Sequence, residues 1–234
     1  MRRFWREAVA APVADGFGIL LDGRPVRTPK RALLAVPTAT LAEAIAAEWA
    51  GAGAECDPRA MPLTGLANAA IDIVSPDPAT FARELAGCGA SDLTCYRAEG
   101  PVELVGRQVA AWEPVLKAVE RAHGLVFRRT AGLVPVAQPE ATLAKLEALL
   151  TATPPFRLAA LSPLVTLSGS VVLGLGVAAG LLDADEGFAA AEVDALWQAE
   201  RWGEDAEAAA VREERRQAFR AAARFLALAG DTRG

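Results

Sequence analysis

The sequence predicts an α+β protein in which a small β-rich N-terminal domain precedes a larger helical C-terminal domain. Residues 1–36 consist of short apolar runs separated by Asp-Gly turns. From Thr40 onward, apolar residues instead recur every three or four positions, as they do on the buried face of a helix. The clearest interruption is the proline-containing run from Ser75 to Pro78. We therefore predict domains over residues 1–76 and 77–234.

The composition is that of a folded protein with few of the residues that enzymes use. Hydrophobic residues make up 53% of the 234 residues and charged residues 23%, which excludes a disordered chain. The formal net charge of −5 disfavours nucleic acid as a partner. The chain has 1 His and 1 Tyr, and this scarcity restricts the acid–base chemistry that it could perform.

Residues 1–36 are expected to form a small antiparallel meander. Asp15-Gly16 and Asp22-Gly23 predict its tight turns, because Gly readily adopts the positive φ that such turns require and Asp tolerates it. The meander is basic, since its cations outnumber Glu7, Asp15 and Asp22. These cations are Arg2, Arg3, Arg6, Arg24, Arg27, Lys30 and Arg31.

Capping residues and prolines predict where the helices begin. Thr40 and Glu43 have the spacing of a capping box, and the helix that they start would bury Leu41, Ile45 and Trp49. The other predicted helices cover residues 62–73, 78–87 and 139–150, and others begin at Pro101 and after Gly203. Asp183 and Glu186 have a second box-like spacing, and the helix that they start is expected to continue to Trp197.

The helix that begins at Pro101 has the longest apolar pattern. Pro114 should kink it, because its ring removes one backbone hydrogen bond. The apolar residues that we expect on its buried face are Val102, Val105, Val109, Trp112, Leu116 and Val119.

The stretch from Leu158 to Leu182 contains no charged residue, and its length would fit a membrane span. Pro163, several hydroxyl residues and four glycines interrupt it, and its flanks lack a one-sided excess of basic residues. We therefore favour a buried central helix and a protein without stable membrane insertion. A membrane-associated factor remains the alternative.

Glycines between Gly174 and Gly180 follow an apolar run and approach the spacing of a dinucleotide-binding loop. That loop requires a preceding strand, a following helix and a βαβ context, which the surrounding sequence does not provide. Tight packing between helices explains the glycines better. A dinucleotide-binding enzyme remains an alternative function.

The sequence does not predict a metal site, a cofactor site or a catalytic residue. His123 precedes Gly124 at the expected end of a helix, where a cation suits the helix dipole. Cys56, Cys88 and Cys95 lack the spacing of a metal knuckle or redox pair, and we expect them to be reduced.

The most unusual segment lies between Trp197 and Glu207, where two tryptophans bracket a charged run at a helix break. Carboxylates in the first turn of a helix stabilise its positive end, and Trp202 could cap the core. The other interpretation is contact with a partner, because Trp and Arg are frequent at the energetic centres of interfaces.

Several motifs resemble those of one known family. They are Arg3-Phe4-Trp5, the run from Gly18 to Pro29, Glu48-Trp49, the run from Met61 to Asn68, Leu161-Ser162-Pro163-Leu164, and Glu200-Arg201-Trp202-Gly203-Glu204-Asp205. The sequence resembles the chaperone family that assembles the F1 head of ATP synthase and holds the unassembled alpha subunit. The resemblance implies a β-rich N-terminal domain, a C-terminal orthogonal helical bundle, and neither catalysis nor a cofactor.

The resemblance also implies a binding site and a location. The expected partner-binding residues are Glu200, Arg201, Trp202, Gly203, Glu204 and Asp205. Among them, Glu200 is the first choice for the family's important acidic position and Asp205 the second. The N-terminus has no long Arg- and Ser-rich transit sequence, which favours the bacterial, cytoplasmic form over the mitochondrial matrix form. We expect a monomer that does not bind nucleic acid.

Overall fold

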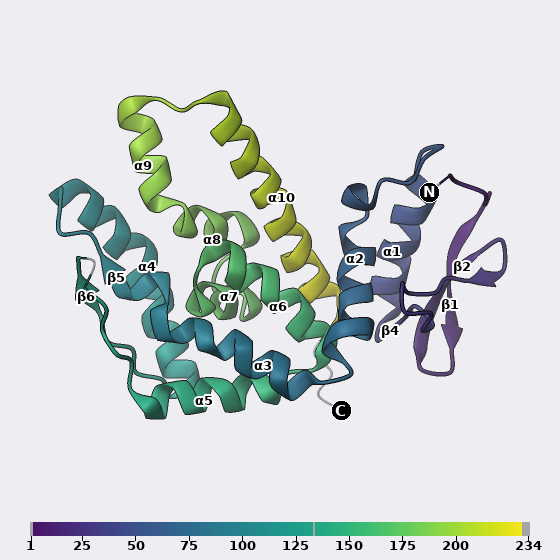
Figure 1. The fold of residues 1–234 in the computed structure, drawn as a ribbon, viewed down its shortest axis with the longest axis horizontal. Coiled ribbons are helices and arrows are strands. Elements are labelled where there is room, and N and C mark those ends of the chain that lie inside the picture. Colours follow the sequence, from purple (N-terminus) through teal and green to yellow (C-terminus); the bar gives the residue numbers. More distant parts are fainter. Residues whose placement is uncertain (1, 133, 231–234) are drawn as a thin grey trace. The chain divides into compact units, whose positions relative to one another are not determined.

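The computed structural model describes residues 2–132 and 134–230 (Figure 1). It forms two compact units. The first contains Met1–Pro78, Pro154–Ala160 and Arg224–Gly234, and the second contains Ala79–Thr153 and Leu161–Ala223. The first unit therefore includes two short segments that return late in the chain. Whether residues 1–76 and 77–234 behave as separate domains stays a prediction.

A small antiparallel sheet forms one side of the first unit. Its strands are β1 (Ala8–Val13), β2 (Gly16–Leu21), β3 (Arg24–Pro25) and β4 (Ala35–Val36). Strand β2 pairs with each of the other three. Turns form at both predicted places, although the first consists of Ala14 and Asp15, and Gly16 already begins β2 opposite Val13. Only Gly fits at position 16, because its φ is +125° and a Cβ atom would lie 2.4 Å from the carbonyl oxygen of Val36.

Helix α1 (Ala39–Gly51) packs against β1 and β2. Its predicted inner face is confirmed, because Leu41, Ile45 and Trp49 are buried. The predicted capping box at Thr40 is wrong. Thr38 has an extended backbone, and its hydroxyl oxygen accepts a hydrogen bond from the backbone N–H of Leu41 at 3.2 Å. Thr40 already lies within the first helical turn.

The first unit is completed by a second helical stretch and the two returning segments. The stretch consists of a 3₁₀ turn (Pro58–Ala60), α2 (Pro62–Ala69) and a π-helical turn (Ala70–Val74), which confirms the helix predicted over residues 62–73. Phe156 and Phe225, one from each returning segment, stack with their ring centroids 6.4 Å apart.

The second unit is almost entirely helical, so the predicted α+β fold class is confirmed. Its helix α4 (Val102–His123) contacts α7, α8 and α9. The other elements are α3 (Pro78–Gly87), two 3₁₀ turns (Cys88–Ser91 and Leu93–Cys95), β5 (Tyr96–Arg97), β6 (Thr130–Ala131), α5 (Glu140–Thr151), α6 (Pro155–Ser168), α7 (Val171–Ala178), α8 (Ala184–Ala191), α9 (Val193–Trp202) and α10 (Ala206–Leu228). Helices α6 and α10 each contribute one end to the first unit.

The buried face of α4 differs from the predicted one near its N-terminus. Val102 and Val109 are exposed, whereas Leu104 and Gln108 are buried. Gln108 occupies a buried position because both ends of its amide are hydrogen-bonded. Its Nε2 donates to Asp194 Oδ1 at 2.7 Å, and its Oε1 accepts from the backbone N–H of Ala98 at 2.8 Å.

The uncharged stretch 158–182 forms two helices, so the single central helix predicted there is wrong. Gly169 has φ +67° and separates α6 from α7, and Ser170 then caps α7 by accepting from the backbone N–H of Leu173 at 3.0 Å. Both helices contribute buried residues, as expected of a core segment. Among the described residues, no helix is both long enough and apolar enough to cross a membrane.

Two glycines of this stretch, Gly174 and Gly176, serve helix packing. A Cβ atom on Gly174 would lie 2.8 Å from Val165 Cγ2, and one on Gly176 would lie 2.5 Å from Val115 Cγ2. Both glycines lie inside α7, and the apolar run before them is the first turn of that helix rather than a strand. The packing interpretation is therefore confirmed for Gly174 and Gly176. Gly180 instead follows α7 with φ +69°, and an added Cβ there would meet no neighbouring atom within 4 Å. The strand–loop–helix geometry of a dinucleotide site is absent here.

Other sequence predictions have mixed outcomes. Asp183 and Glu186 form the predicted capping box, but the helix that they start ends at Ala191, and α9 begins after Glu192. His123 ends α4, and Gly124 follows it with φ +63°.

The three cysteines form no disulfide in the described chain, and burial raises the pKa of the Cys95 thiol to about 12.

Candidate partner-binding site

The six predicted partner-binding residues lie together at the end of α9 and in the connection to α10. Glu200, Arg201 and Trp202 form the last turn of α9, and all six residues are exposed. Gly203 ends the helix with φ +83° while its N–H donates to the carbonyl oxygen of Ala199 at 2.9 Å. The helix break thus turns several charged side chains and one aromatic side chain toward solvent.

A network of ion pairs connects this turn to the N-terminal part of α4. Arg107 Nη1 donates to Glu200 Oε2 at 2.7 Å, and Arg107 Nη2 lies 3.3 Å from Glu103 Oε1. Arg201 pairs with the other oxygen of Glu103. The hydrogen bond from Arg201 is the main reason why the pKa of Glu103 is lowered. Glu200 therefore has a structural partner, although both side chains remain accessible to water.

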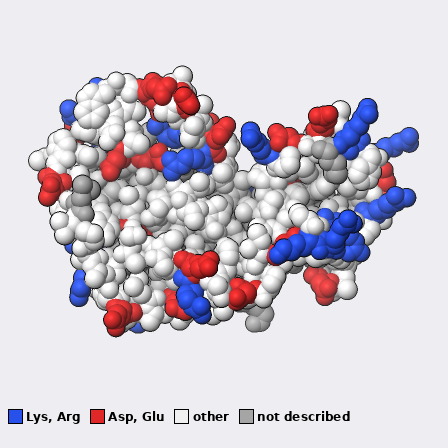
Figure 2. Space-filling model, in the orientation of Figure 1, with Lys and Arg blue, Asp and Glu red and all other residues white. Residues whose placement is uncertain are grey.

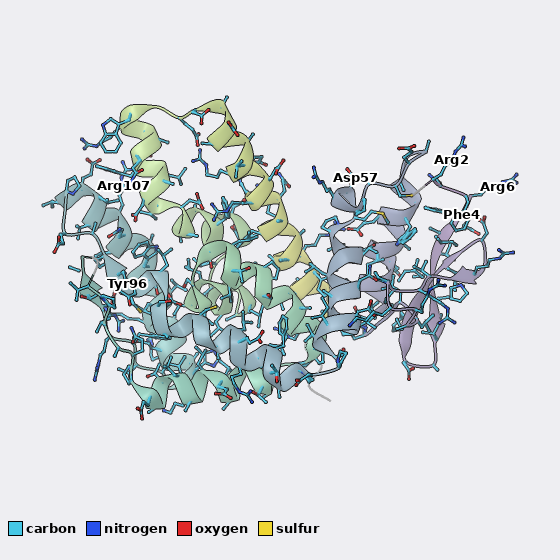
Figure 3. The ribbon with its side chains drawn as sticks, viewed as in Figure 1. Arg2, Phe4, Arg6, Asp57, Tyr96 and Arg107 are labelled. Carbon is cyan, nitrogen blue, oxygen red and sulfur yellow. The ribbon has the colours of Figure 1, made fainter. Side chains whose placement is uncertain are left out.

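Sequence reasoning missed the contribution of α4 to this site. Glu103 and Arg107 lie four residues apart, and this helical charge pair is visible in the sequence. Their meeting with Glu200 and Arg201 could not be foreseen, because it depends on how α4 and α9 pack. Figure 3 marks the position of Arg107 on α4.

The two tryptophans at the end of α9 have opposite environments. Trp197 is buried, whereas the side chain of Trp202 is 72% exposed. Their rings contact edge to face with centroids 5.4 Å apart, and the guanidinium of Arg201 lies 4.8 Å from the ring centroid of Trp197. The interpretation of Trp202 as a cap on the core is wrong. It is a large apolar surface supported by a buried neighbour, which suits contact with a partner.

The acidic residues after Gly203 mainly support α10. Asp205 caps this helix, because its carboxylate accepts from the backbone N–H of Glu207 at 2.9 Å and from that of Ala208 at 3.4 Å. Glu204 pairs with Arg212 in the second turn of α10. Of the two acidic candidates, Asp205 accepts hydrogen bonds from the backbone of α10, whereas Glu200 pairs with the side chain of Arg107. Both assignments stay predictions.

A groove of about 410 Å³ separates α8 and α9 from α10. Phe188 and Leu196 supply apolar lining, and Glu192, Arg212 and Arg216 supply charged groups. Glu192 is buried and pairs with Arg215 at 2.8 Å. The groove therefore combines apolar contact area with charges of both signs beside the predicted site.

The model of the ATP12 chaperone protein family matches residues 2–120. The chain belongs to the ATP12 chaperone family. This confirms the resemblance to a family of ATP synthase assembly chaperones. The match ends before α5, so the predicted site at 200–205 lies outside it.

Solved structures extend the similarity to ATP12 proteins over nearly the whole chain. Atp12 from Paracoccus denitrificans is 42% identical with a TM-score of 0.93, and the alignment covers 98% of both chains. An Asp-to-Lys variant of P. denitrificans Atp12p is 41% identical with the same TM-score of 0.93. A protein of Agrobacterium tumefaciens is 37% identical with a TM-score of 0.92, over 97% of this chain and 85% of that one.

A curated ATP12 relative comes from a eukaryote. The mitochondrial protein atp12 of Schizosaccharomyces pombe is 25% identical over 215 residues, which are 86% of this chain and 74% of that protein.

Proposed function

We propose that this ATP12 family member binds the unassembled alpha subunit of the ATP synthase F1 head and prevents its aggregation until it pairs with beta. Membership of the ATP12 chaperone family carries the proposal. An unassembled ring subunit exposes a large apolar interface, and such a surface tends to self-associate. A chaperone that covers this interface needs a surface that binds well but can be displaced by the correct neighbour.

The end of α9 has the properties that such a contact requires. Trp202 offers apolar area, and Glu200 and Arg201 offer charges that water can still reach. A contact of this mixed kind gives specificity and exchanges more readily than an entirely apolar one. We therefore assign alpha-subunit binding to residues 200–205, with Trp202 supplying contact area and Glu200 supplying charge recognition.

We further propose that the chain works as a monomer in the bacterial cytoplasm, without a cofactor and without catalysis. The alternative of a dinucleotide-binding enzyme is disfavoured because Gly174 and Gly176 are enclosed by side chains of α4 and α6. Thermal unfolding with and without NAD(H) or NADP(H) provides a direct test. A saturable stabilisation at micromolar dinucleotide would contradict the non-enzymatic proposal.

Co-expression with the alpha subunit alone tests the proposed function. The chaperone should increase the soluble fraction of alpha and co-purify with it, whereas added beta should release it. Trp202→Ala should weaken this effect, and Val134→Ala, which shortens another exposed apolar side chain, should not. Failure of the unaltered chain to bind or solubilise alpha would contradict the proposal itself. Equal activity of Trp202→Ala would contradict only the assignment of the site.

A further inference from the structure

The segment before β1, in the first unit, alternates between inward and outward side chains. Trp5 is buried and Arg3 is partly buried, whereas Arg2, Phe4 and Arg6 are exposed. This period of two is that of an extended chain. Figure 3 marks Arg2, Phe4 and Arg6 on this segment and shows the two arginines projecting outward. We call these three side chains the outer triplet.

The inward side chains fix the segment to the end of α1. Arg3 Nη1 donates to the carbonyl oxygens of Ala50 at 3.1 Å and Ala52 at 2.7 Å. Trp5 Nε1 donates to the carbonyl oxygen of Trp49 at 3.1 Å. A guanidinium at this position satisfies carbonyl groups that the helix end leaves unpaired. The outer triplet is therefore presented from an anchored backbone, which reduces the entropy lost on binding.

The backbone of the segment is also held at both ends. The N–H of Arg3 donates to the carbonyl oxygen of Ala54 at 2.9 Å. At the other end, the N–H groups of Arg6 and Glu7 donate to Asp22 Oδ1 at 3.1 and 2.9 Å. The backbone hydrogen bond from Glu7 is the main reason why the pKa of Asp22 is lowered. This carboxylate is thus hydrogen-bonded mainly by the backbone, and Arg6 attracts it only as a smaller contribution to the lowered pKa, without an ion pair between the two side chains among the described contacts.

The outer triplet has no evident role in folding. Phe4 is 69% exposed and contacts only the edge of Trp5 among the ring pairs of the described residues, with centroids 5.1 Å apart. Arg2 and Arg6 form no ion pair with another described side chain. An exposed aromatic ring flanked by two guanidinium groups is a composition typical of the centre of a protein interface.

We propose that the outer triplet binds an extended acidic segment of a partner protein. Arg2 and Arg6 lie four positions apart in this extended segment, which corresponds to about 13 Å along the chain. A partner strand alongside would place two carboxylates with the same separation and an apolar side chain between them. The recognised pattern is therefore acidic–x–apolar–x–acidic, with each carboxylate paired with one guanidinium and the apolar side chain packed on Phe4.

The charges around the outer triplet favour a peptide over an anionic lipid surface or nucleic acid. Glu7 is exposed beside Arg6, and Glu55 pairs through its backbone with Arg2. Figure 2 shows that acidic side chains lie among the Lys and Arg side chains of this unit. The closely spaced phosphates of a lipid surface or a nucleic acid would be repelled by these carboxylates. A peptide avoids this repulsion, because its carboxylates can lie only opposite the arginines.

This interaction goes beyond the proposed function, because the outer triplet belongs to the first unit and residues 200–205 belong to the second. The full chain can be titrated with the synthetic peptide Ser-Glu-Ala-Leu-Ala-Glu-Ser while the indole N–H resonance of Trp5 is followed by NMR. We expect a saturable shift of this resonance. A peptide of the same composition with its two Glu residues adjacent should bind about tenfold more weakly.

Variants connect the binding to the outer triplet. Arg2→Glu combined with Arg6→Glu should weaken binding about tenfold or more, and Phe4→Ala should also weaken it. Arg121→Glu reverses an exposed charge in the second unit and should leave the affinity unchanged. Equal binding by the double variant, or by the peptide with adjacent Glu residues, would overturn the proposal. Co-sedimentation with phosphatidylserine vesicles that the double variant loses, without any peptide binding, would replace it with a lipid contact.

Discussion

Arg107 Nη1 donates to Glu200 Oε2 at 2.7 Å and thereby ties the last turn of α9 to α4. Both side chains remain in contact with solvent, and the pKa of Arg107 is raised mainly by this hydrogen bond. Exposed ion pairs contribute little to stability because water competes for both charges. The pair therefore orients Glu200, but the stability of the fold does not depend on the pair.

Glu200→Ala should leave the midpoint of thermal unfolding nearly unchanged and should weaken alpha-subunit binding about tenfold. Differential scanning fluorimetry and a co-purification assay measure the two effects. Arg107→Ala serves as the control for stability, because it breaks the same ion pair and leaves the Glu200 carboxylate in place. If Glu200→Ala unfolds early, the residue is structural and its assignment to the site is wrong.

The two tryptophans of α9 should respond oppositely to truncation. Trp197→Ala removes a buried ring and should lower the free energy of unfolding by about 3–5 kcal/mol. Trp202→Ala removes a mainly exposed ring, so it should affect alpha-subunit binding more than stability. Chemical denaturation of both variants, together with the binding assay, distinguishes these outcomes. A large loss of stability in Trp202→Ala with normal binding would reverse our interpretation of the pair.

The carboxylate of Asp185, at the start of α8, should contribute to folding stability in a way that depends on pH. Its carboxylate accepts hydrogen bonds from Arg220 at 2.6 and 2.7 Å and from Arg216 at 3.0 Å. The hydrogen bond from Arg220 is the main reason why the pKa of Asp185 falls from 3.8 to about 2. Because the pKa is lower in the folded state, the carboxylate stabilises the fold above pH 3.8, and this stabilisation is lost as the pH falls toward 2.

Asp185→Asn should therefore lower the unfolding midpoint at neutral pH, and its difference from the unaltered chain should shrink as the pH falls from about 4 to about 2. Thermal unfolding across this interval measures the effect. Glu207→Gln, which also removes a carboxylate from the first turn of a helix, is the control. A difference that stays constant with pH would show that Asp185 does not act through its charge.

The sequence predicted local structure well where a residue type strongly favours one backbone conformation or one burial pattern. The Asp-Gly turns, the Asp183–Glu186 capping box and the apolar face of α1 are examples. Predictions failed where long-range contacts decide the outcome. Gln108 is buried because Ala98 and Asp194 reach it from other elements. The uncharged stretch 158–182 breaks at Gly169, where the N–H of Leu93 donates to the Gly169 carbonyl oxygen and the hydroxyl of Ser170 donates to Asp92.

For the candidate site, too, local sequence signals were readable and long-range contacts were not. Its residues could be selected from the sequence because two tryptophans bracket a charged run, but their roles could not. Capping by Asp205 and pairing of Glu200 with Arg107 depend on backbone geometry and on the packing of α9 against α4. The segment that carries the outer triplet alternates in exposure because Arg3 and Trp5 have partners at the end of α1, and residue types alone did not reveal those partners.

The packing role of Gly176 gives the last prediction. A Cβ atom at this position would lie 2.5 Å from Val115 Cγ2 of α4, and the neighbouring helices leave little room for either to move. Gly176→Ala should therefore reduce the free energy of unfolding by about 1–3 kcal/mol, despite the higher helix propensity of Ala. Adding Val115→Ala removes the clashing methyl groups, so the loss in the double variant should be smaller than the sum of the two single losses.

Gly106→Ala in α4 is the matched control, because no atom lies within 4 Å of the added Cβ and the residue is exposed. It should stabilise the chain by about 1 kcal/mol through helix propensity alone. Urea denaturation of the four variants measures all these differences on one scale. If Gly176→Ala behaves like Gly106→Ala, α7 does not require glycine to approach α4, and the packing interpretation of the glycine stretch is wrong. Additive losses for Gly176→Ala and Val115→Ala would show that the two positions do not clash, because only a shared contact makes the second substitution relieve the first.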